Sequence, residues 1–144
     1  MNIKRNGDAD MKKFLSFAMS LIRVLGLIGC GGIANGKHMP SLKKVSAWEM
    51  VAFCDLIIGR AEKAKADFGT PDAKVYTDFR KMFDEMGNKF EAVVVETPDF
   101  SHFPCVMLAL NQGKHVWVEK PMARTFYECQ LMIDAARRNP QLVT

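Results

Sequence analysis

The sequence has little of what builds metal clusters or disulfide scaffolds. Its 144 residues include four cysteines and three histidines, and no two cysteines form the closely spaced pair of a zinc site. We therefore predict no metal site, and we interpret the thiols as reduced, as in a cytoplasmic protein. These thiols belong to Cys30, Cys54, Cys105 and Cys129.

The sequence also lacks a strong excess of charge of one sign. The formal net charge is +4, and residues 1–23 carry five basic and two acidic side chains, so most of the excess lies there. The remaining chain is close to neutral. Nucleic-acid binding depends on many contacts between basic side chains and phosphates, so we predict no nucleic-acid partner.

No long apolar run is present. The stretch 14–22 follows Lys12 and Lys13, but it is much shorter than the roughly 20 apolar residues of a membrane span. It also lacks the small-residue cleavage site of a signal peptide, and no twin-arginine signal precedes it. We predict no membrane partner, and we expect residues 1–22 to form a tail or a short helix.

The rest of the sequence has the character of one globular domain. Hydrophobic residues make up 49% of the chain and charged residues 25%, which suits a single buried core over residues 23–144. Short apolar runs alternate with amphipathic segments, the pattern of βαβ units that form a doubly wound parallel α/β sheet of the Rossmann type. The expected strands are Leu21–Ile28, Trp48–Cys54, Val75–Tyr76, Ala92–Glu96 and His115–Glu119, with Gln141–Thr144 beginning a sixth.

Five helices are expected between these strands. The first runs from a glycine-rich turn to about Lys37, because Pro40 limits its continuation. Caps and glycines delimit the others. We expect a helix over 60–68 that ends at Gly69, and one over 79–86 with Thr77 as its cap and Gly87 as its end. The next helix is expected to begin at the cap Ser101, with Pro104 in its first turn, and to end at Gly113. The last is expected to begin at a capping box of Thr125 and Glu128 and to end at about Asn139, before Pro140.

The first of the chemically informative motifs is the glycine-rich turn Gly29-Cys30-Gly31-Gly32-Ile33-Ala34. It matches G-x-G-x-x-A directly after a buried strand and at the opening of a helix. In such a loop the first glycine permits a tight turn and the second lets the backbone approach a pyrophosphate, which the helix amides then face. The alternative is a plain tight turn. We take Gly29, Gly31, Gly32 and Ile33 as candidate cofactor contacts.

An acidic residue ends the second expected strand. Asp55 lies near the offset expected for the carboxylate that binds the adenosine ribose hydroxyls, and it would repel the extra phosphate of NADP. The alternative is a cap for the following turn. Arg60 is close enough in sequence to stack on adenine or to offer a counter-charge, and otherwise it is an ordinary exposed residue. The pattern favours NAD over NADP.

Methyltransferases also combine a glycine-rich turn with an acid after the second strand, so two further segments decide. They are Thr97-Pro98-Asp99-Phe100-Ser101-His102 and Gly113-Lys114-His115-Val116-Trp117-Val118-Glu119-Lys120-Pro121. Together with the glycine turn they resemble the N-terminal domain of the Gfo/Idh/MocA oxidoreductases, the family of glucose-fructose oxidoreductase and inositol dehydrogenase. The resemblance covers about residues 23–144, and the ordered combination is far more specific than any one motif.

The resemblance implies roles for individual residues. In that family the lysine of Glu-Lys-Pro reaches the nicotinamide and the substrate, so Lys120 is the candidate catalytic residue, with Glu119 and Pro121 beside it. The segment after the fourth strand borders the cofactor, which makes Thr97, Pro98 and His102 candidate contacts. For His102 a structural or capping role is the alternative.

The residues give support that does not depend on the resemblance. Gly29, Asp55, Thr97 and Lys120 all fall at the carboxyl ends of expected strands. Ligands of doubly wound sheets bind along that edge, so the four candidates are expected to share one rim.

We therefore expect the nucleotide-binding domain of an NAD-dependent oxidoreductase that transfers hydride to or from a sugar, cyclitol or similar polyol. The family's second α/β domain is not in the chain, so we expect no turnover from the chain alone. The alternatives are a nonenzymatic NAD-binding sensor or assembly module and, less favoured, a methyltransferase-like domain. Uncovered apolar surface leaves self-association into a homo-oligomer open.

Overall fold

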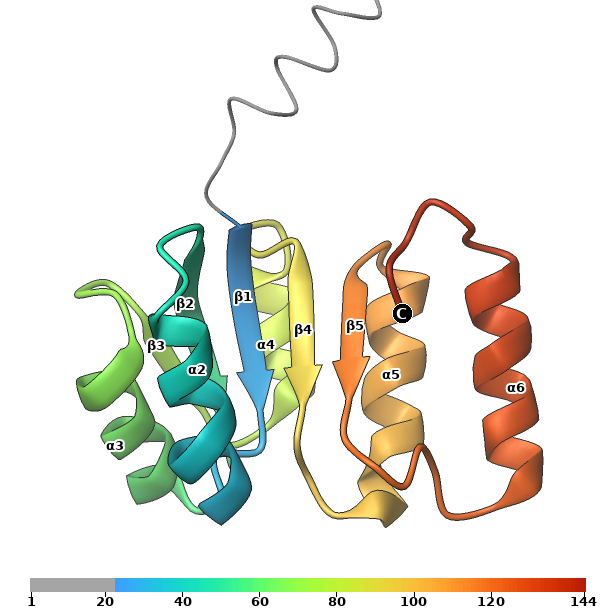
Figure 1. The fold of residues 1–144 in the computed structure, drawn as a ribbon, viewed down its shortest axis with the longest axis horizontal. Helices are drawn as coiled ribbons and strands as arrows, with labels where there is room; N and C mark the ends of the chain where they lie inside the picture. Colours follow the sequence, from blue (N-terminus) through green and yellow to red (C-terminus); the bar gives the residue numbers. More distant parts are fainter. Residues whose placement is uncertain (1–22) are drawn as a thin grey trace, which may run out of the picture.

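The computed structural model describes residues 23–144, which form a parallel sheet with helices on both faces (Figure 1). The strand order is β3-β2-β1-β4-β5, and every neighbouring pair is parallel. This confirms the predicted doubly wound α/β class. The strands are β1 (Arg23–Ile28), β2 (Trp48–Cys54), β3 (Lys74–Tyr76), β4 (Ala92–Val95) and β5 (His115–Val118).

The helices bury their apolar stripes on opposite faces of the sheet. A π-helical turn and α2, together with α3, pack on one face around Leu27 and Phe53. The other three helices pack on the reverse face around Val93 and Val95. In Figure 1 α2 lies in front of the sheet and α4 behind it. The helical elements are η1 (Ala34–His38), α2 (Met39–Lys43), α3 (Ile58–Phe68), α4 (Phe79–Met86), the 3-10 turn η2 (Asp99–Ser101), α5 (His102–Asn111) and α6 (Phe126–Arg137).

Several local predictions are confirmed. The second strand has the predicted bounds. Gly69 and Gly87 lie directly after α3 and α4 as predicted. At α6 the Thr125 hydroxyl accepts from the Glu128 amide and the Glu128 carboxylate accepts from the Thr125 amide, the predicted capping box. These signals are short-range, so neighbouring residues suffice to specify them.

The end of the first helix was predicted wrongly. Helical backbone continues past Lys37 through η1 into α2, with Pro40 near the start of α2. In a regular α-helix the ring of Pro40 would clash with the carbonyl four residues earlier. The wide turn of η1, in which the Met39 amide donates to the Ala34 carbonyl, changes the register before the proline.

Two predicted caps and one predicted strand also differ. Asp78, not Thr77, caps α4, because its carboxylate accepts from the Arg80 amide. Ser101 precedes α5 as predicted, but its hydroxyl donates to the Pro98 carbonyl instead of capping the helix. Residues 141–144 form no strand, although the Val143 carbonyl accepts from the Val116 amide at the edge of β5.

The predictions for residues 1–22 lie outside the described part of the chain. Within residues 23–144 no helix combines the length and apolar character that crossing a membrane requires.

Candidate functional site

The glycine turn begins at a position where only glycine fits. Gly29 has a φ of +96°, and a Cβ added there would lie 2.5 Å from the backbone carbonyl carbon of Glu96 and 2.7 Å from the amide nitrogen of Thr97. L-residues avoid this φ, and the neighbouring backbone just after β4 leaves no room for a side chain. The turn therefore holds the ends of β1 and β4 in close contact.

The next two glycines face open space. A Cβ added at Gly31 or Gly32 meets no atom within 4 Å. The helical run starts here, with the Asn35 amide donating to the Gly31 carbonyl at 3.0 Å. First-turn amides of a helix have no acceptor within the helix and attract anions. The loop therefore has both the space and the donors that a diphosphate needs, and the exposed Ile33 lies in the same turn.

Asp55 follows β2 and is anchored to the glycine turn. One carboxylate oxygen accepts from the Cys30 amide at 2.9 Å, and the other accepts from the Ile57 amide at 2.8 Å. The capping alternative is thus realised. A carboxylate has about four acceptor sites, so two remain for ribose hydroxyls, and ribose binding stays a prediction.

The segment after Asp55 carries an exposed apolar run that the sequence analysis did not single out. Leu56 is 89% exposed, and Ile57 and Ile58 are also exposed. Arg60 is exposed in the first turn of α3. The sequence did carry a signal for this exposed run. Three consecutive apolar residues follow the acid at the strand end, whereas the buried positions of a helix are spaced three and four residues apart. They offer a surface that an aromatic base can cover.

The end of β4 places Glu96, Thr97 and Pro98 beside the glycine turn. The Glu96 amide donates to the Ile28 carbonyl at 2.7 Å and so extends the pairing with β1. Thr97 is half-buried, and its hydroxyl has no hydrogen-bond partner among residues 23–144. Pro98 is exposed. An unpaired buried hydroxyl at this edge is available to a ligand.

His102 is buried and joins two loops. Its ring is 1% exposed, with Nε2 2.6 Å from the Thr97 carbonyl and Nδ1 2.9 Å from the Pro121 carbonyl. Both ring nitrogens are therefore occupied by backbone groups. This geometry agrees with the structural role that was the alternative for His102. The resemblance implies a direct contact with the cofactor, but neither ring nitrogen is free to make one.

Lys120 lies just beyond β5 at the same edge. The Glu119 amide donates to the Val95 carbonyl, and the Glu119 carboxylate accepts from the Lys120 amide at 3.1 Å. The Lys120–Pro121 peptide bond is cis. The Lys120 side chain is exposed, so the ammonium group is accessible to a ligand at the rim.

A cluster that the sequence analysis missed lies between these loops. His38, at the end of η1, places Nδ1 3.0 Å from the Glu96 carboxylate and Nε2 3.2 Å from the Glu119 carboxylate. These are ion-pair distances when the ring is protonated. Burial raises the pKa of Glu96, and the negative charge of Glu119 adds to the rise, whereas His38 opposes it. A buried carboxylate needs such a partner.

The glycine turn contains a buried cysteine, Cys30. Burial, followed by the charge of Asp55, raises the pKa of Cys30 to about 12. Burial likewise raises the pKa of Cys54 and of Cys105 to about 12. Because the thiolate is the reactive form, these three thiols are poor candidates for chemistry at this edge. Among residues 23–144 no cluster of three His, Cys, Asp or Glu residues could hold a metal ion.

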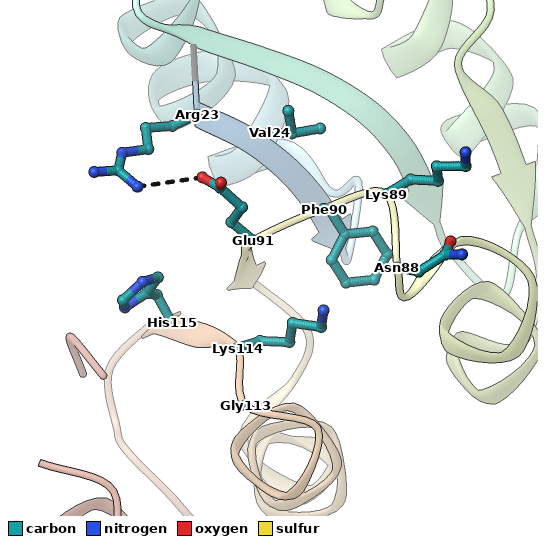
Figure 2. Close-up of a pocket in the computed structure, with 9 residues that line it drawn as sticks. All are labelled: Arg23, Val24, Asn88, Lys89, Phe90, Glu91, Gly113, Lys114 and His115. Atoms are coloured by element: carbon teal, nitrogen blue, oxygen red, sulfur yellow. Dashed lines mark hydrogen bonds and ion pairs between the residues drawn. The ribbon is translucent and has the colours of Figure 1, made fainter. Parts of the chain in front are cut away.

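One hollow lies away from these residues. An open hollow of about 490 Å³ is found at the amino edge of the sheet, between the starts of β1 and β5 and the segment before β4 (Figure 2). Arg23 crosses its rim to pair with Glu91 at 3.3 Å, and Lys114 lies over the Phe90 ring. None of the predicted site residues lines it.

The predicted site residues thus gather at the carboxyl edge. The arrowheads of β1, β4 and β5 point to the same lower edge in Figure 1. Gly29, Asp55, Thr97 and Lys120 each lie directly after a strand or within two residues of its end. This is the edge at which doubly wound sheets bind nucleotides.

Comparison with known proteins identifies the family. Residues 23–144 match the Gfo/Idh/MocA family, described as an oxidoreductase family with an NAD-binding Rossmann fold. The chain is 32% identical over 114 residues to inositol 2-dehydrogenase of Salmonella paratyphi B, covering 79% of the chain and 33% of that protein. It is 33% identical over 117 residues to glucose-6-phosphate 3-dehydrogenase of Bacillus subtilis, covering 81% of the chain and 31% of that protein.

A solved structure shows the same arrangement. The WlbA dehydrogenase from Chromobacterium violaceum, in complex with NADH and UDP-GlcNAcA, superposes with a TM-score of 0.73 at 26% identity, covering 83% of this chain and 33% of that one. The chain therefore spans about a third of the relatives it matches. The profile match over residues 23–144 and the shared fold show that this chain belongs to the Gfo/Idh/MocA oxidoreductase family and carries its NAD-binding Rossmann domain.

Proposed function

We propose that this domain binds NAD along the carboxyl edge of the sheet and serves hydride transfer to or from a sugar, cyclitol or similar polyol. The convergence of Gly29, Asp55, Thr97 and Lys120 on that edge carries the proposal. The names of the relatives support the substrate class, since they include a dehydrogenase of inositol and one of glucose 6-phosphate.

The residues present fit the cofactor. In the proposed arrangement the diphosphate lies against Gly31 and Gly32, where an added Cβ meets open space and the first-turn amides donate. Asp55 accepts from the adenosine ribose hydroxyls with the acceptor sites that its backbone partners leave. The same carboxylate repels the ribose phosphate of NADP, and Arg60 at the start of α3 offers only one counter-charge. Adenine lies over the apolar run that begins at Leu56.

The chemistry divides between cofactor and protein. Bound nicotinamide supplies the hydride acceptor or donor. Lys120, exposed at the rim, is proposed to hold or release the proton at the reacting oxygen of the substrate, and its ammonium form stabilises negative charge there. Thr97 and Pro98 border the same space from the end of β4, with Glu119 and Pro121 on either side of the lysine.

Nucleotide binding can be tested on the chain itself by thermal and urea unfolding with NAD⁺, NADP⁺ or S-adenosylmethionine. Ligand at about 100 times its dissociation constant adds roughly 2.7 kcal/mol. We expect stabilisation by NAD⁺ that exceeds that by NADP⁺. Because Asp55 also anchors two backbone amides, Asp55→Asn is a better variant than alanine: it keeps an acceptor oxygen and removes the charge.

The outcomes separate the candidate functions. If NAD⁺ gives no stabilisation while S-adenosylmethionine does, the domain is methyltransferase-like and the proposal fails. A nonenzymatic sensor or assembly module would bind NAD⁺ equally well. The enzyme is tested with a protein that contains both this domain and a substrate domain. Such a protein should form NADH from NAD⁺ with a member of a polyol panel, and Lys120→Met should abolish this activity; a sensor or assembly module would show neither result.

We further propose a cytoplasmic location, a small-molecule substrate and no nucleic-acid partner. The four cysteines are free, as thiols in a reducing compartment are. The near-neutral charge of the chain after residue 23 gives polyanions little to bind. Gel filtration of the chain with fluorescent duplex DNA tests the second point, and co-elution would contradict it.

A further inference from the structure

The peptide segment around Lys120 is tied to two other elements of the sheet edge. On its carboxyl side, the Pro121 carbonyl lies 2.9 Å from Nδ1 of His102 at the start of α5. The other ring nitrogen lies 2.6 Å from the Thr97 carbonyl. A single buried ring thus spans the loop after β4 and the loop after β5. Both partners are acceptors, so a neutral ring donates to one of them and a protonated ring to both. When Nδ1 carries a proton, moving Pro121 would leave a buried donor without an acceptor, which is costly.

On the amino side of Lys120 the tie passes through Glu119. One Glu119 oxygen lies 3.2 Å from Nε2 of His38, and the other accepts from the Lys120 amide at 3.1 Å. The opposite ring nitrogen of His38 lies 3.0 Å from Glu96, whose side chain is only 1% exposed. These contacts are attractions between charges, because His38 Nδ1 and the Glu96 oxygens lack hydrogen-bond geometry. When the ring is protonated, the two carboxylates draw His38 into the space between them.

The backbone before His38 is shaped for this contact. Ala34 and Met39 are both fully buried although five residues apart. In an α-helix that spacing would place them on different faces, whereas one π turn aligns them. The turn that aligns them is η1, which ends at His38. The Trp117 ring of β5 stands edge-on to the imidazole, with centroids 6.5 Å apart.

We propose that His38 and His102 are positioning residues that fix the two peptide neighbours of Lys120 and so aim its side chain along the rim. This inference rests on the proposed role of Lys120 at the reaction centre. The two rings come from different elements, one from the glycine-loop helix and one from α5, so the lysine is positioned relative to both the phosphate-binding turn and the Thr97 loop.

We call the contacts of His38 with Glu119 and of His102 with Pro121 the clamp. Amide exchange in the chain without ligand tests it directly. The Lys120 amide donates to a neighbouring carboxylate, and the Ile57 amide does the same with Asp55. We expect His38→Gln to speed exchange of the Lys120 amide by about fivefold, the factor for one net hydrogen bond, and to leave the Ile57 amide unchanged. The matched control is His115→Gln at the amino end of β5, which should change neither rate.

A second readout follows the lysine side chain. Lysines are ¹³C-dimethylated, and Lys120 is assigned with Lys120→Arg. In the wild type, NAD⁺ should shift the Lys120 methyl resonance, and His38→Gln or His102→Gln should reduce that shift while the Kd for NAD⁺ stays within a few-fold. If His38→Gln fails to fold, Glu119→Gln replaces it, because it removes the charge that faces His38 and keeps the shape of the side chain.

The results distinguish this inference from the function on which it rests. Absence of NAD⁺ binding by the wild type defeats the proposed function, and the exchange rates of the Lys120 amide still report on the clamp. Wild-type exchange rates and an undiminished Lys120 shift in folded variants of both histidines would overturn the clamp even if NAD⁺ binds. Faster Lys120 exchange in His38→Gln, with no further effect in the Glu119→Gln background, would support it.

Discussion

Replacing Gly29 by alanine is expected to destabilise the fold strongly, whereas the same change two residues later should leave its stability nearly unchanged. At Gly29 the added methyl group meets two penalties. The φ of +96° costs an L-residue roughly 1–2 kcal/mol. The methyl carbon would also lie 2.5 Å from the carbonyl carbon and 2.6 Å from the oxygen of Glu96. These are backbone atoms of a central strand end, so they cannot rotate away.

The expected loss is a large share of the stability. Overpacking in a tight site costs about 1–3 kcal/mol, so the two penalties together give about 2–5 kcal/mol out of the 5–15 kcal/mol typical of a domain. Urea unfolding followed by circular dichroism measures the loss. A Gly29→Ala protein within 1 kcal/mol of the wild type would refute the reasoning, because it would mean that the β1–β4 contact yields easily.

The paired variants are Gly31→Ala and Gly32→Ala. Neither added methyl group meets an atom within 4 Å, and alanine is favoured over glycine in a helical turn. Stability should therefore be unchanged or slightly higher. NAD⁺ binding should weaken by at least about tenfold, or ~1.4 kcal/mol, because the methyl group occupies the space assigned to the diphosphate. Gly36→Ala, also open to solvent and within η1, is the control: its stability should likewise be unchanged or slightly higher, and its NAD⁺ binding should be unchanged.

Three further predictions follow from the packing and the caps. Iodoacetamide should label only Cys129 in the native protein, because the other three thiols are buried and have a pKa of about 12. Peptide mass spectrometry identifies the labelled cysteines, and rapid labelling of Cys30 would contradict the prediction. Burial raises the pKa of Glu96 above its ordinary value. The wild type should therefore lose stability relative to Glu96→Gln as the pH rises from the ordinary carboxyl range through the raised value. Urea unfolding in a pH series that starts at about 4, near the pKa of a free carboxyl group, should show a growing difference, and a constant difference would count against a buried carboxylate. Thr125→Ala should lower the free energy of unfolding by about 1 kcal/mol, because it breaks the capping box. Ser101→Ala should lower it much less, because the Ser101 hydroxyl does not cap α5. Equal losses in urea unfolding would show that the cap assignment is wrong.

The fold was predictable because its signals are local. The alternation of apolar runs and amphipathic segments specified the parallel sheet, and the bounds of β2 follow from its apolar run. Caps were predictable where the side chain had a single local partner, as with Thr125. They failed where two candidates were adjacent: Asp78 caps α4 in place of Thr77, and composition alone does not choose between neighbours that both favour that position.

The site was predictable in outline and not in its internal contacts. Strand ends that carry Gly29, Asp55 and Lys120 meet at one edge by topology alone. The contact of His38 with Glu96 and Glu119 depends on the wide turn of η1, which sequence periodicity did not reveal. The occupied ring of His102 likewise depends on two loops distant in the chain. Such contacts follow from three-dimensional packing and leave no spacing signal.

The wide turn at η1 has a consequence for comparisons between relatives. A π turn accommodates one residue more than the regular helix that it interrupts. A relative with a regular helix here would need one residue fewer between its glycine loop and its second strand. Counting forward from the glycines would then assign the wrong counterpart to His38. Equivalent positions on this helix are better matched by which side chain reaches the carboxylate after β5 than by residue number.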